Sequence, residues 1–391
     1  MYRNTRFAEL MKGLPRKTFE NIVSTHQSDK HNKGFRSWDQ LLAMIYAQVS
    51  GCNSLRELEA GFNSQSAHHY HLGCQRIKRS TLSDANSNRV SDVFSDACSL
   101  LLSQAHRKAK KELKHLLYLI DSTPIPLTGL GYDDWASKEK DNRIQGLKAH
   151  VILAPQVSAP VHLDVTVPKV SDLEVGRKTS LEKGATYVFD RGYTDYNWWF
   201  TIDQAQSYFV SRFKNNASLV YEKQLPINDK AKDLILEDAV VSFKNKRPGG
   251  KRINNYYGTT LRKITVNRPD KETPMVIATN DFNRTAEEIA DLYKQRWGIE
   301  LFFKWIKQNL KIKKFLGRSR NAVKIQIYTA LITYLLVRTY HRHTGQINTL
   351  KMCLIELRAT LFQRIEIELM LDRKRRKLAA DYQDVQRVLA L

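Results

Sequence analysis

Short runs of apolar residues recur through the middle of the chain and predict β-strands. Four of them lie in its first part, at residues 116–121, 148–153, 162–167 and 186–190. Each run is rich in branched or aromatic side chains and is bounded by polar or turn-forming residues. The first three are close enough in sequence to form an antiparallel meander. Residues 171–184 then provide a crossover helix or turn before the fourth strand.

Three strands, a crossover and a further strand are the order of a ribonuclease H-like α/β sheet. Asp121 closes the first strand and Asp190 closes the fourth. In that order the first and fourth strands are neighbours, so the two aspartates are expected to lie side by side. Further strand-like runs at residues 208–213, 239–243, 260–266 and 275–278 predict a β-rich insertion after the second aspartate.

The two ends of the chain show helical rather than strand periodicity. Trp38, Leu41 and Ile45 recur at helical spacing, and Ser54 is expected to cap the following helix. Residues 80–84 form a capping-box-like start for the next helix. Successive short helices of this kind predict a helix-turn-helix-like DNA reader, and a plain helical packing module is the alternative.

Charge narrows the class of partner. Lys and Arg number 63 against 40 Asp and Glu in 391 residues, a formal net charge of +23. Such a field favours a polyanion, and DNA is the expected partner rather than a generally adhesive basic surface. Basic runs at residues 107–111, 244–247 and 373–377 are dispersed along the chain, as a long DNA track requires.

Cysteine use and hydropathy indicate a cytoplasmic protein without a membrane segment. The 4 cysteines have no CxxC spacing and are expected to be reduced thiols. The N-terminus lacks the apolar core of a secretory signal. The longest apolar helix candidate, residues 325–337, is too short to cross a bilayer.

A helix beginning at the capping box Thr285-Ala286-Glu287-Glu288 carries the third candidate carboxylate, Glu300. Tyr293, Arg296, Glu300 and Lys307 fall within a stripe about 60° wide at 100° per residue. Apolar positions border the stripe on both flanks, one being residues 292, 299, 303, 306 and 310 and the other residues 297, 301 and 305. This arrangement predicts a cleft wall, whereas Arg296 and Glu300 alone would be read as a surface ion pair.

Two strand-end aspartates and a helical glutamate can hold two divalent metals, which can break and rejoin phosphodiesters. Here the chain resembles the IS4 family of bacterial DDE transposases. The resemblance is carried by Tyr-x2-Arg-x3-Glu-x6-Lys at 293–307, by Ile120-Asp121-Ser122-Thr123 and by Asp190-Arg191-Gly192-Tyr193. It covers roughly residues 115–340, and the N-terminal region is similar to the helical module that precedes the catalytic domain in one branch of these transposases.

The resemblance implies a DNA transposase in which Asp121, Asp190 and Glu300 bind two Mg²⁺ ions, with Mn²⁺ as a substitute. Without metal, at least one of the crowded carboxylates should have a raised pKa. Tyr293, Arg296 and Lys307 are expected to contact phosphates of the transposon ends. The enzyme would cleave the terminal inverted repeats and join their 3′-hydroxyls to target DNA, as a homodimer on DNA near the bacterial nucleoid.

The implied organisation has five segments. They are a helical N-terminal DNA-binding region (1–110), a ribonuclease H-like catalytic domain in two parts (111–206 and 281–342), the β-rich insertion (207–280) and a helical C-terminal region (343–391). Two other function classes are a ribonuclease H-like DNA nuclease without strand transfer and a catalytically inactive DNA-binding relative. Rival metal ligands are Asp172 with Glu174, or His68, His69, His71 and Cys74, and Lys148 is a candidate phosphate contact.

Overall fold

The computed structural model describes residues 4–32, 34–129, 131–132, 135–136, 145–247, 254–269, 271–345, 348–364 and 376–378. The chain divides into two compact units. The first, the sheet unit, comprises Leu102–Pro126 and Ser137–Phe303. The second, the helical unit, comprises Met1–Leu101, Leu127–Ala136 and Lys304–Leu391. The regions expected to be helical at the two ends of the chain thus share one unit.

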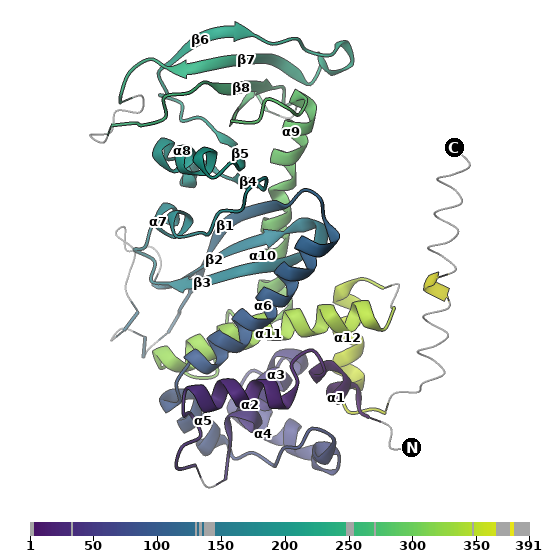
Figure 1. The fold of residues 1–391 in the computed structure, drawn as a ribbon. Coiled ribbons are helices and arrows are strands. Elements are labelled where there is room, and N and C mark those ends of the chain that lie inside the picture. The colour runs from purple at the N-terminus through teal and green to yellow at the C-terminus, as the bar shows by residue number, and fades with distance from the viewer. Residues whose placement is uncertain are drawn as a thin grey trace. The chain divides into compact units, whose positions relative to one another are not determined.

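The sheet unit contains a single mixed sheet (Figure 1). Its strands within the described residues run in the order β3-β2-β1-β4-β5-β9-β8-β7-β6. Their bounds are β1 (Leu117–Pro126), β2 (Gly146–Ala154), β3 (Ala159–Thr166), β4 (Thr186–Phe189), β5 (Tyr208–Arg212), β6 (Leu219–Gln224), β7 (Ile235–Phe243), β8 (Leu261–Val266) and β9 (Met275–Thr279). β1, β2 and β3 are antiparallel, and β4 is parallel to β1. The predicted meander and the ribonuclease H-like α/β order are confirmed, with α7 (Asp172–Arg177) in the crossover.

The strands after the second aspartate do not form a separate sheet. β5 pairs in parallel with β4, and β9 then joins β5 so that β8, β7 and β6 extend the same sheet. The sequence pattern missed β6, at residues 219–224. Five of its six residues are exposed because it is an edge strand, so it lacks the apolar run that signals a buried strand.

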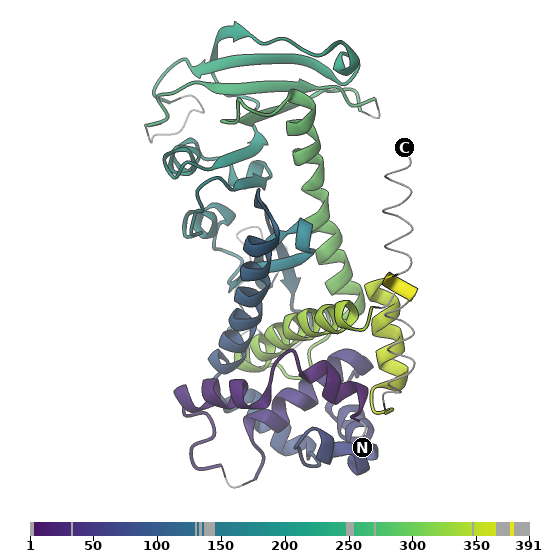
Figure 2. The ribbon, with the colours of Figure 1, turned by 45° about the vertical axis from the view of Figure 1, so that its right-hand side comes forward.

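Aromatic side chains fill the core on one face of the sheet. Trp199 of α8 (Tyr196–Gln204) is fully buried, and its ring lies 4.6 Å from that of Phe209 on β5. Asp195 fixes the start of α8 by accepting a hydrogen bond from the backbone N–H of Trp198. Figures 1 and 2 show α7 and α8 on this face and α9 (Ala286–Gln295) on the opposite face. The sheet is therefore covered on both sides, as its largely apolar central strands require.

The helix predicted from residue 285 is tightened at Arg296. Its start is confirmed, because Thr285 and Glu288 form the expected capping box. α9 ends at Gln295 and α10 (Trp297–Asn309) follows at once. The backbone N–H of Arg296 donates to Tyr293 O at 3.1 Å, and that of Ile299 donates to Arg296 O at 3.1 Å. Both hydrogen bonds join residues three apart, as in a 3₁₀ turn. The helix therefore departs at Arg296 from the uniform 100° per residue on which the predicted stripe was based.

The helical unit is organised around α11 (Arg320–His343), which packs against α1, α3, α5 and α12. Its helices are α1 (Arg6–Met11), α2 (Arg16–Thr25), α3 (Ser37–Ser50), α4 (Leu55–Ser64), α5 (Arg79–Asn88) and α12 (Leu350–Thr360), with the N-terminal part of α6 (Asp92–Glu112) and the C-terminal part of α10. The described residues also form four short 3₁₀ turns. They are η1 (Ser66–His71) in the helical unit, and η2 (Pro155–Val157), η3 (Arg191–Tyr193) and η4 (Asp229–Ala231) in the sheet unit.

One of the two predicted N-terminal caps is wrong. Ser54 caps α4 as expected, accepting a hydrogen bond from the backbone N–H of Glu57. α5 begins instead at Arg79 with Lys78 as the capping residue. The Arg79 N–H donates at 3.2 Å to the Glu59 carboxylate of α4, so a tertiary contact replaces the local cap. About half of the predicted C-terminal helical region (343–391) and residues 373–375 of the basic run fall on residues 365–375 and 379–391, which lie outside the described residues.

Candidate active site

The two predicted aspartates lie at adjacent strand positions. Ile120 of β1 pairs with Phe189, the last residue of β4; Asp121 is the next residue of β1, and Asp190 directly follows the end of β4. Asp121 Oδ1 accepts a hydrogen bond from the Ser122 N–H at 2.8 Å. Asp190 begins η3, and its Oδ1 accepts from the Gly192 N–H at 2.8 Å. Parallel pairing of β1 and β4 therefore brings together two carboxylates that are far apart in sequence.

Arg296 links the helical glutamate to this pair. Its guanidinium donates to Glu300 Oε1 at 2.6 Å and lies 3.8 Å from Asp121 Oδ2. The side chains of Arg296 and Asp121 are 18% and 19% exposed, so neither charge is freely solvated. Glu300 and Asp121 thus converge on one cation within the sheet unit. The surface ion pair between Arg296 and Glu300 is only part of the contact, because the same guanidinium also faces Asp121.

The pKa of Asp121 is raised, as expected for at least one of the three carboxylates. Burial is the main cause, and the Asp190 and Glu300 carboxylates add to it. The Ser122 amide and Arg296 act in the opposite direction, leaving the Asp121 pKa at about 6. A buried carboxyl with like charges beside it gains from any added cation.

Tyr293 is a buried neighbour of the site rather than an exposed face of the helix. Its side chain is 8% exposed, and the Arg296 guanidinium carbon lies 6.0 Å from its ring centre. Burial raises the pKa of its hydroxyl, while Arg296 and Arg212 lower it. The tyrosine therefore packs among guanidinium groups beside Asp190.

Lys307 falls in the part of α10 that belongs to the helical unit. Burial and the nearby Lys313 lower its pKa, as expected for a cation crowded by another cation. Its alignment with Glu300 remains a prediction. On α10 the flank containing Ile299 and Phe303 is buried as predicted. The opposite flank is exposed at two of its residues, because Trp297 and Leu301 are 58% and 52% exposed.

Sequence reasoning missed two arginines that surround the site. Arg191 follows Asp190 directly, and Arg212 ends β5, the strand beside β4. The Nε atoms of Arg191, Arg212 and Arg296 are buried and have no hydrogen-bond partner within the described structure. Burial, followed by the neighbouring charges of Arg212 and Arg268, lowers the pKa of Arg191. Arg191 was visible in the Asp-Arg-Gly-Tyr motif, whereas Arg212 required the pairing of β5 with β4.

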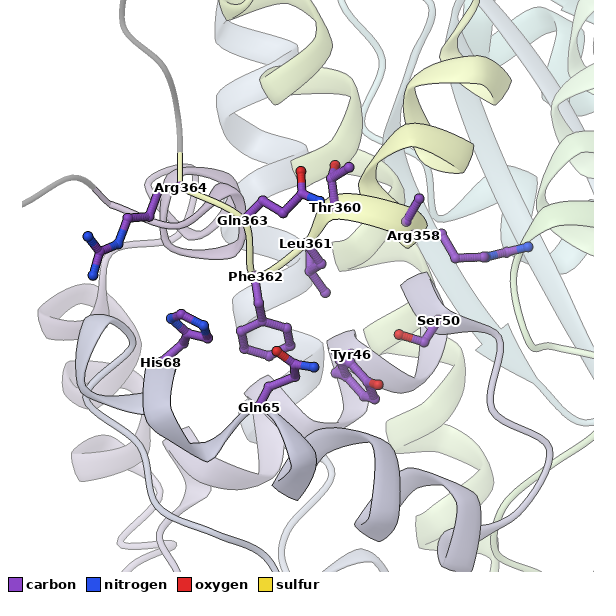
Figure 3. A pocket seen from close by; sticks show the side chains of 11 residues that line it. Tyr46, Ser50, Gln65, His68, Arg358, Thr360, Leu361, Phe362, Gln363 and Arg364 are labelled. Carbon is purple, nitrogen blue, oxygen red and sulfur yellow. The ribbon is translucent and has the colours of Figure 1, made fainter.

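The rival ligand sets are engaged in other contacts. Asp172 accepts hydrogen bonds from Ser122 and Lys148, and Glu174 pairs with Lys178. Lys148, the candidate phosphate contact, thus faces a carboxylate. In the helical unit His68 lies beside Phe362 in a pocket of about 570 Å³ (Figure 3).

The remaining members of the histidine and cysteine set also behave as packing residues. His69 is 4% exposed, and its Nε2 lies 3.0 Å from the Phe62 carbonyl oxygen. Burial raises the pKa of Cys74 to about 12, which keeps it a thiol. Burial also lowers the pKa of His71, and the nearby Arg364 acts in the same direction. His69 and Cys74 are thus engaged by the backbone carbonyls of Phe62 and His69 rather than grouped as metal ligands.

The three carboxylates fit a divalent cation in donor type, since Mg²⁺ and Mn²⁺ prefer carboxylate oxygens. Arg296 already places positive charge between two of them. Among the described residues, no group of three or more His, Cys, Asp or Glu side chains is placed so that it could hold a metal ion. The donors are therefore of the right kind, and a guanidinium stands between two of them.

The prediction that Asp121 closes the first strand is wrong, because β1 continues to Pro126. A ribonuclease H-like sheet with one aspartate inside its first strand and another directly after its fourth defines an enzyme class that processes phosphodiesters. A family model described as "Transposase DDE domain" matches residues 112–336, and one described as "Domain of unknown function (DUF4372)" matches residues 2–75. The chain belongs to the DDE transposases. It is a DNA transposase, a DNA-cleaving and strand-transferring enzyme that acts on DNA, and the family implies dependence on a divalent metal.

Known relatives support this family and the predicted resemblance to IS4-type enzymes. A putative transposase y4zB of Sinorhizobium fredii (strain NBRC 101917 / NGR234) is 42% identical over 66% of this chain and 70% of its own length. A probable transposase for insertion sequence element IS5377 of Geobacillus stearothermophilus is 27% identical over 70% of each chain. A putative transposase for insertion sequence element IS4SA of Synechocystis sp. (strain ATCC 27184 / PCC 6803 / Kazusa) is 28% identical over 68% and 72%.

A solved piggyBac transposase synaptic complex with hairpin DNA has a TM-score of 0.46 to this structure at 10% identity, covering 95% of this chain and 82% of that one. Across the described residues, no helix combines the length and apolar character needed to cross a membrane.

Proposed function

We propose that Asp121, Asp190 and Glu300 bind two Mg²⁺ ions, with Mn²⁺ as a substitute, and cleave the ends of an insertion sequence. The supporting observation is the convergence of Asp121 and Glu300 on Arg296, beside the strand position of Asp190. Two such ions would activate the attacking oxygen and stabilise the leaving oxygen. The joined products would be transposon 3′-ends linked to target DNA.

Arg296 has two tasks in this proposal. In the protein alone it neutralises Asp121 and Glu300, which would otherwise repel each other in a partly buried site. When DNA is bound, the Arg296 guanidinium would exchange these carboxylates for a phosphate. Arginine suits this role because its paired N–H donors match phosphate oxygens. The Tyr293 ring, beside the guanidinium, would help to position Arg296 for this exchange of partners.

Phosphates of the terminal inverted repeats would be held by Tyr293, Arg296 and Lys307, together with Arg191 and Arg212. The buried Nε donors of these last two arginines have no hydrogen-bond acceptor among the described residues. Buried polar groups are normally paired, so such donors favour an anionic ligand. The enzyme would act as a homodimer that holds two transposon ends, and its substrate would place it at the bacterial nucleoid.

A cleavage assay on end-containing DNA with Mg²⁺ tests the proposal. Glu300→Gln should abolish cleavage while leaving DNA binding intact, and Asp291→Asn, an exposed acid-to-amide change on the preceding helix, should cut like the parent. Appearance of joined products in the parent distinguishes strand transfer from a plain nuclease. Equal cutting by Glu300→Gln and the parent would show the carboxylate assignment to be wrong.

A further inference from the structure

A fourth carboxylate, Asp172, is connected to the candidate metal ligands. It is the first residue of α7, and its Oδ1 accepts a hydrogen bond of 2.6 Å from the Ser122 hydroxyl. Ser122 follows Asp121 in β1, and its backbone N–H donates to Asp121 Oδ1 at 2.8 Å. Ser122 therefore holds Asp121 through its amide and Asp172 through its hydroxyl.

Asp172 also lies close to the turn that carries Asp190. A methyl group placed on Gly192 would stand 3.0 Å from Asp190 Oδ1 and 3.7 Å from Asp172 Oδ2. The two carboxylates thus flank the same glycine, whose N–H donates to Asp190. A larger residue at position 192 would press on the Asp190 carboxylate, so glycine preserves this close approach.

The charge of Asp172 is balanced from β2. Lys148 Nζ lies 3.4 Å from Asp172 Oδ1, and His150 Nδ1 lies 3.5 Å from the same oxygen. His150 is 2% exposed, and its pKa is lowered chiefly by burial and raised in part by Asp172 and Asp164. Lys148 is the permanently charged partner, and it also donates to the Val170 carbonyl at 3.2 Å, just before α7. One lysine thus fixes both the carboxylate and the chain that leads into it.

Tyr193 provides a second observation that places Asp172 beside Asp121 and Asp190. Its side chain is 1% exposed, and its hydroxyl has no hydrogen-bond partner within the described structure. Burial is the main cause that raises the pKa of this hydroxyl; the carboxylates of Asp172, Asp121 and Asp190 add to the rise, and the Ser122 hydroxyl opposes it. The ring is close to α7, because a methyl group on Gly176 would stand 3.2 Å from Tyr193 Cδ1.

We propose that Asp172 is a positioning residue of the metal site, acting on Asp121 through the Ser122 hydroxyl and paired with Lys148. Residues that orient metal ligands affect metal affinity although they do not touch the metal. The inference rests on the proposed function, in which Asp121 and Asp190 bind metal. It goes beyond that function by adding a residue and a path: Asp172 to Ser122 to Asp121.

The test is Mn²⁺ binding by the full chain without DNA, followed by electron paramagnetic resonance and calorimetry. Ser122→Ala and Asp172→Ala should each weaken Mn²⁺ binding on the order of tenfold. The double variant should bind no worse than either single one, because both changes cut the same path. Asp172→Asn keeps an acceptor for the Ser122 hydroxyl and should recover most of the affinity. Glu174→Gln removes a charge from the same turn of α7 without touching Ser122, and should bind like the parent.

Two results would overturn the inference. If Asp172 were itself a ligand, Asp172→Asn would be as damaging as Asp172→Ala, and Ser122→Ala would have no effect. If the cluster only served packing, the variants would lower stability against urea and leave Mn²⁺ affinity at the parent value. Failure of the proposed function has a different signature: Asp121→Asn would then bind Mn²⁺ as tightly as the parent.

Discussion

Two regions of the sheet unit bury arginine beside acidic residues, and they treat these charges differently. Arg262 on β8 forms two hydrogen bonds to the Asp238 carboxylate, at 2.9 and 2.7 Å, and donates to the Asp281 carbonyl at 3.1 Å. Arg262, Asp238 and Asp281 are 5%, 1% and 1% exposed. Around Asp121, by contrast, the buried Nε donors of three arginines have no hydrogen-bond partner in the part of the chain that the structure describes.

This difference separates structural charge from functional charge. A buried ion pair is tolerated when hydrogen bonds satisfy it, and Arg262 meets that condition within the protein. The arginines near Asp121 are not fully hydrogen-bonded within the described protein, and the pKa of the Asp121 carboxyl is raised. Arginine donors without an acceptor favour an anionic ligand, and a carboxyl with a raised pKa favours an added cation. A DNA phosphate with its metal ions would satisfy both.

The largest expected effect is catalytic and should appear only in the unsatisfied region. Asp190→Asn should lower DNA cleavage on the order of a thousandfold, about 4 kcal/mol of barrier, because the proposed metal site would lose one of its ligands. Its urea midpoint should stay near that of the parent. Gel-based cleavage and urea unfolding measure the two quantities, with Asp229→Asn, an 89% exposed acid, as the control. If Asp190→Asn cleaved DNA like the parent, the charges around Asp121 would have no more functional role than those around Arg262.

The structural region should give the reverse result. Arg262→Met leaves Asp238 as a buried, unpaired charge and should destabilise the fold by about 3–5 kcal/mol. Urea unfolding followed by tryptophan fluorescence measures this loss. Arg247→Met changes an exposed arginine and should stay within about 0.5 kcal/mol of the parent. A stable Arg262→Met protein would mean that the pair is dispensable and the comparison misleading.

The dependence of stability on pH should further distinguish the regions. The folded pKa of Asp121 is about 6, against an ordinary value of 3.8. A raised acid pKa gives stability that is fully present below the ordinary pKa and is lost as pH rises through the folded pKa. In metal-free buffer, Asp121→Asn should therefore match the parent near pH 4 and exceed it above pH 6 by at most about 3 kcal/mol.

Urea unfolding across this pH range checks the sign. Asp238→Asn, which disrupts the satisfied pair, should destabilise the protein at neutral pH, where Asp121→Asn stabilises it. A constant offset between Asp121→Asn and the parent from pH 4 to 7 would contradict the raised pKa.

The smallest expected effect concerns DNA binding. Arg212→Gln should reduce the slope of log affinity against log salt by about 1, because one phosphate contact is lost. Arg191→Gln should do the same. Fluorescence anisotropy with labelled end-containing DNA at several salt concentrations measures the slope, and Arg247→Gln provides an exposed control. An unchanged slope in both variants would mean that their free donors do not serve DNA.

The sequence was sufficient for much of the fold because the sheet obeys local rules. Buried strands such as β1 and β4 carry dense apolar runs, and the crossover order places their ends side by side. Asp121, Asp190 and Glu300 could be selected because each ends or lies in an element with a clear pattern. The capping box at Thr285 was equally local, and it formed as expected.

Other features required contacts between distant residues. β6 is an exposed edge strand without an apolar run, and α5 starts at Arg79 because Glu59 of another helix accepts its N–H. The tight turn at Arg296 and the approach of its guanidinium to Asp121 come from packing against the sheet. Sequence by itself determined which chemical groups are present and on which elements they lie. The tertiary structure decided which of them meet, which charges are satisfied and which remain available, because burial and long-range pairing have no local signature.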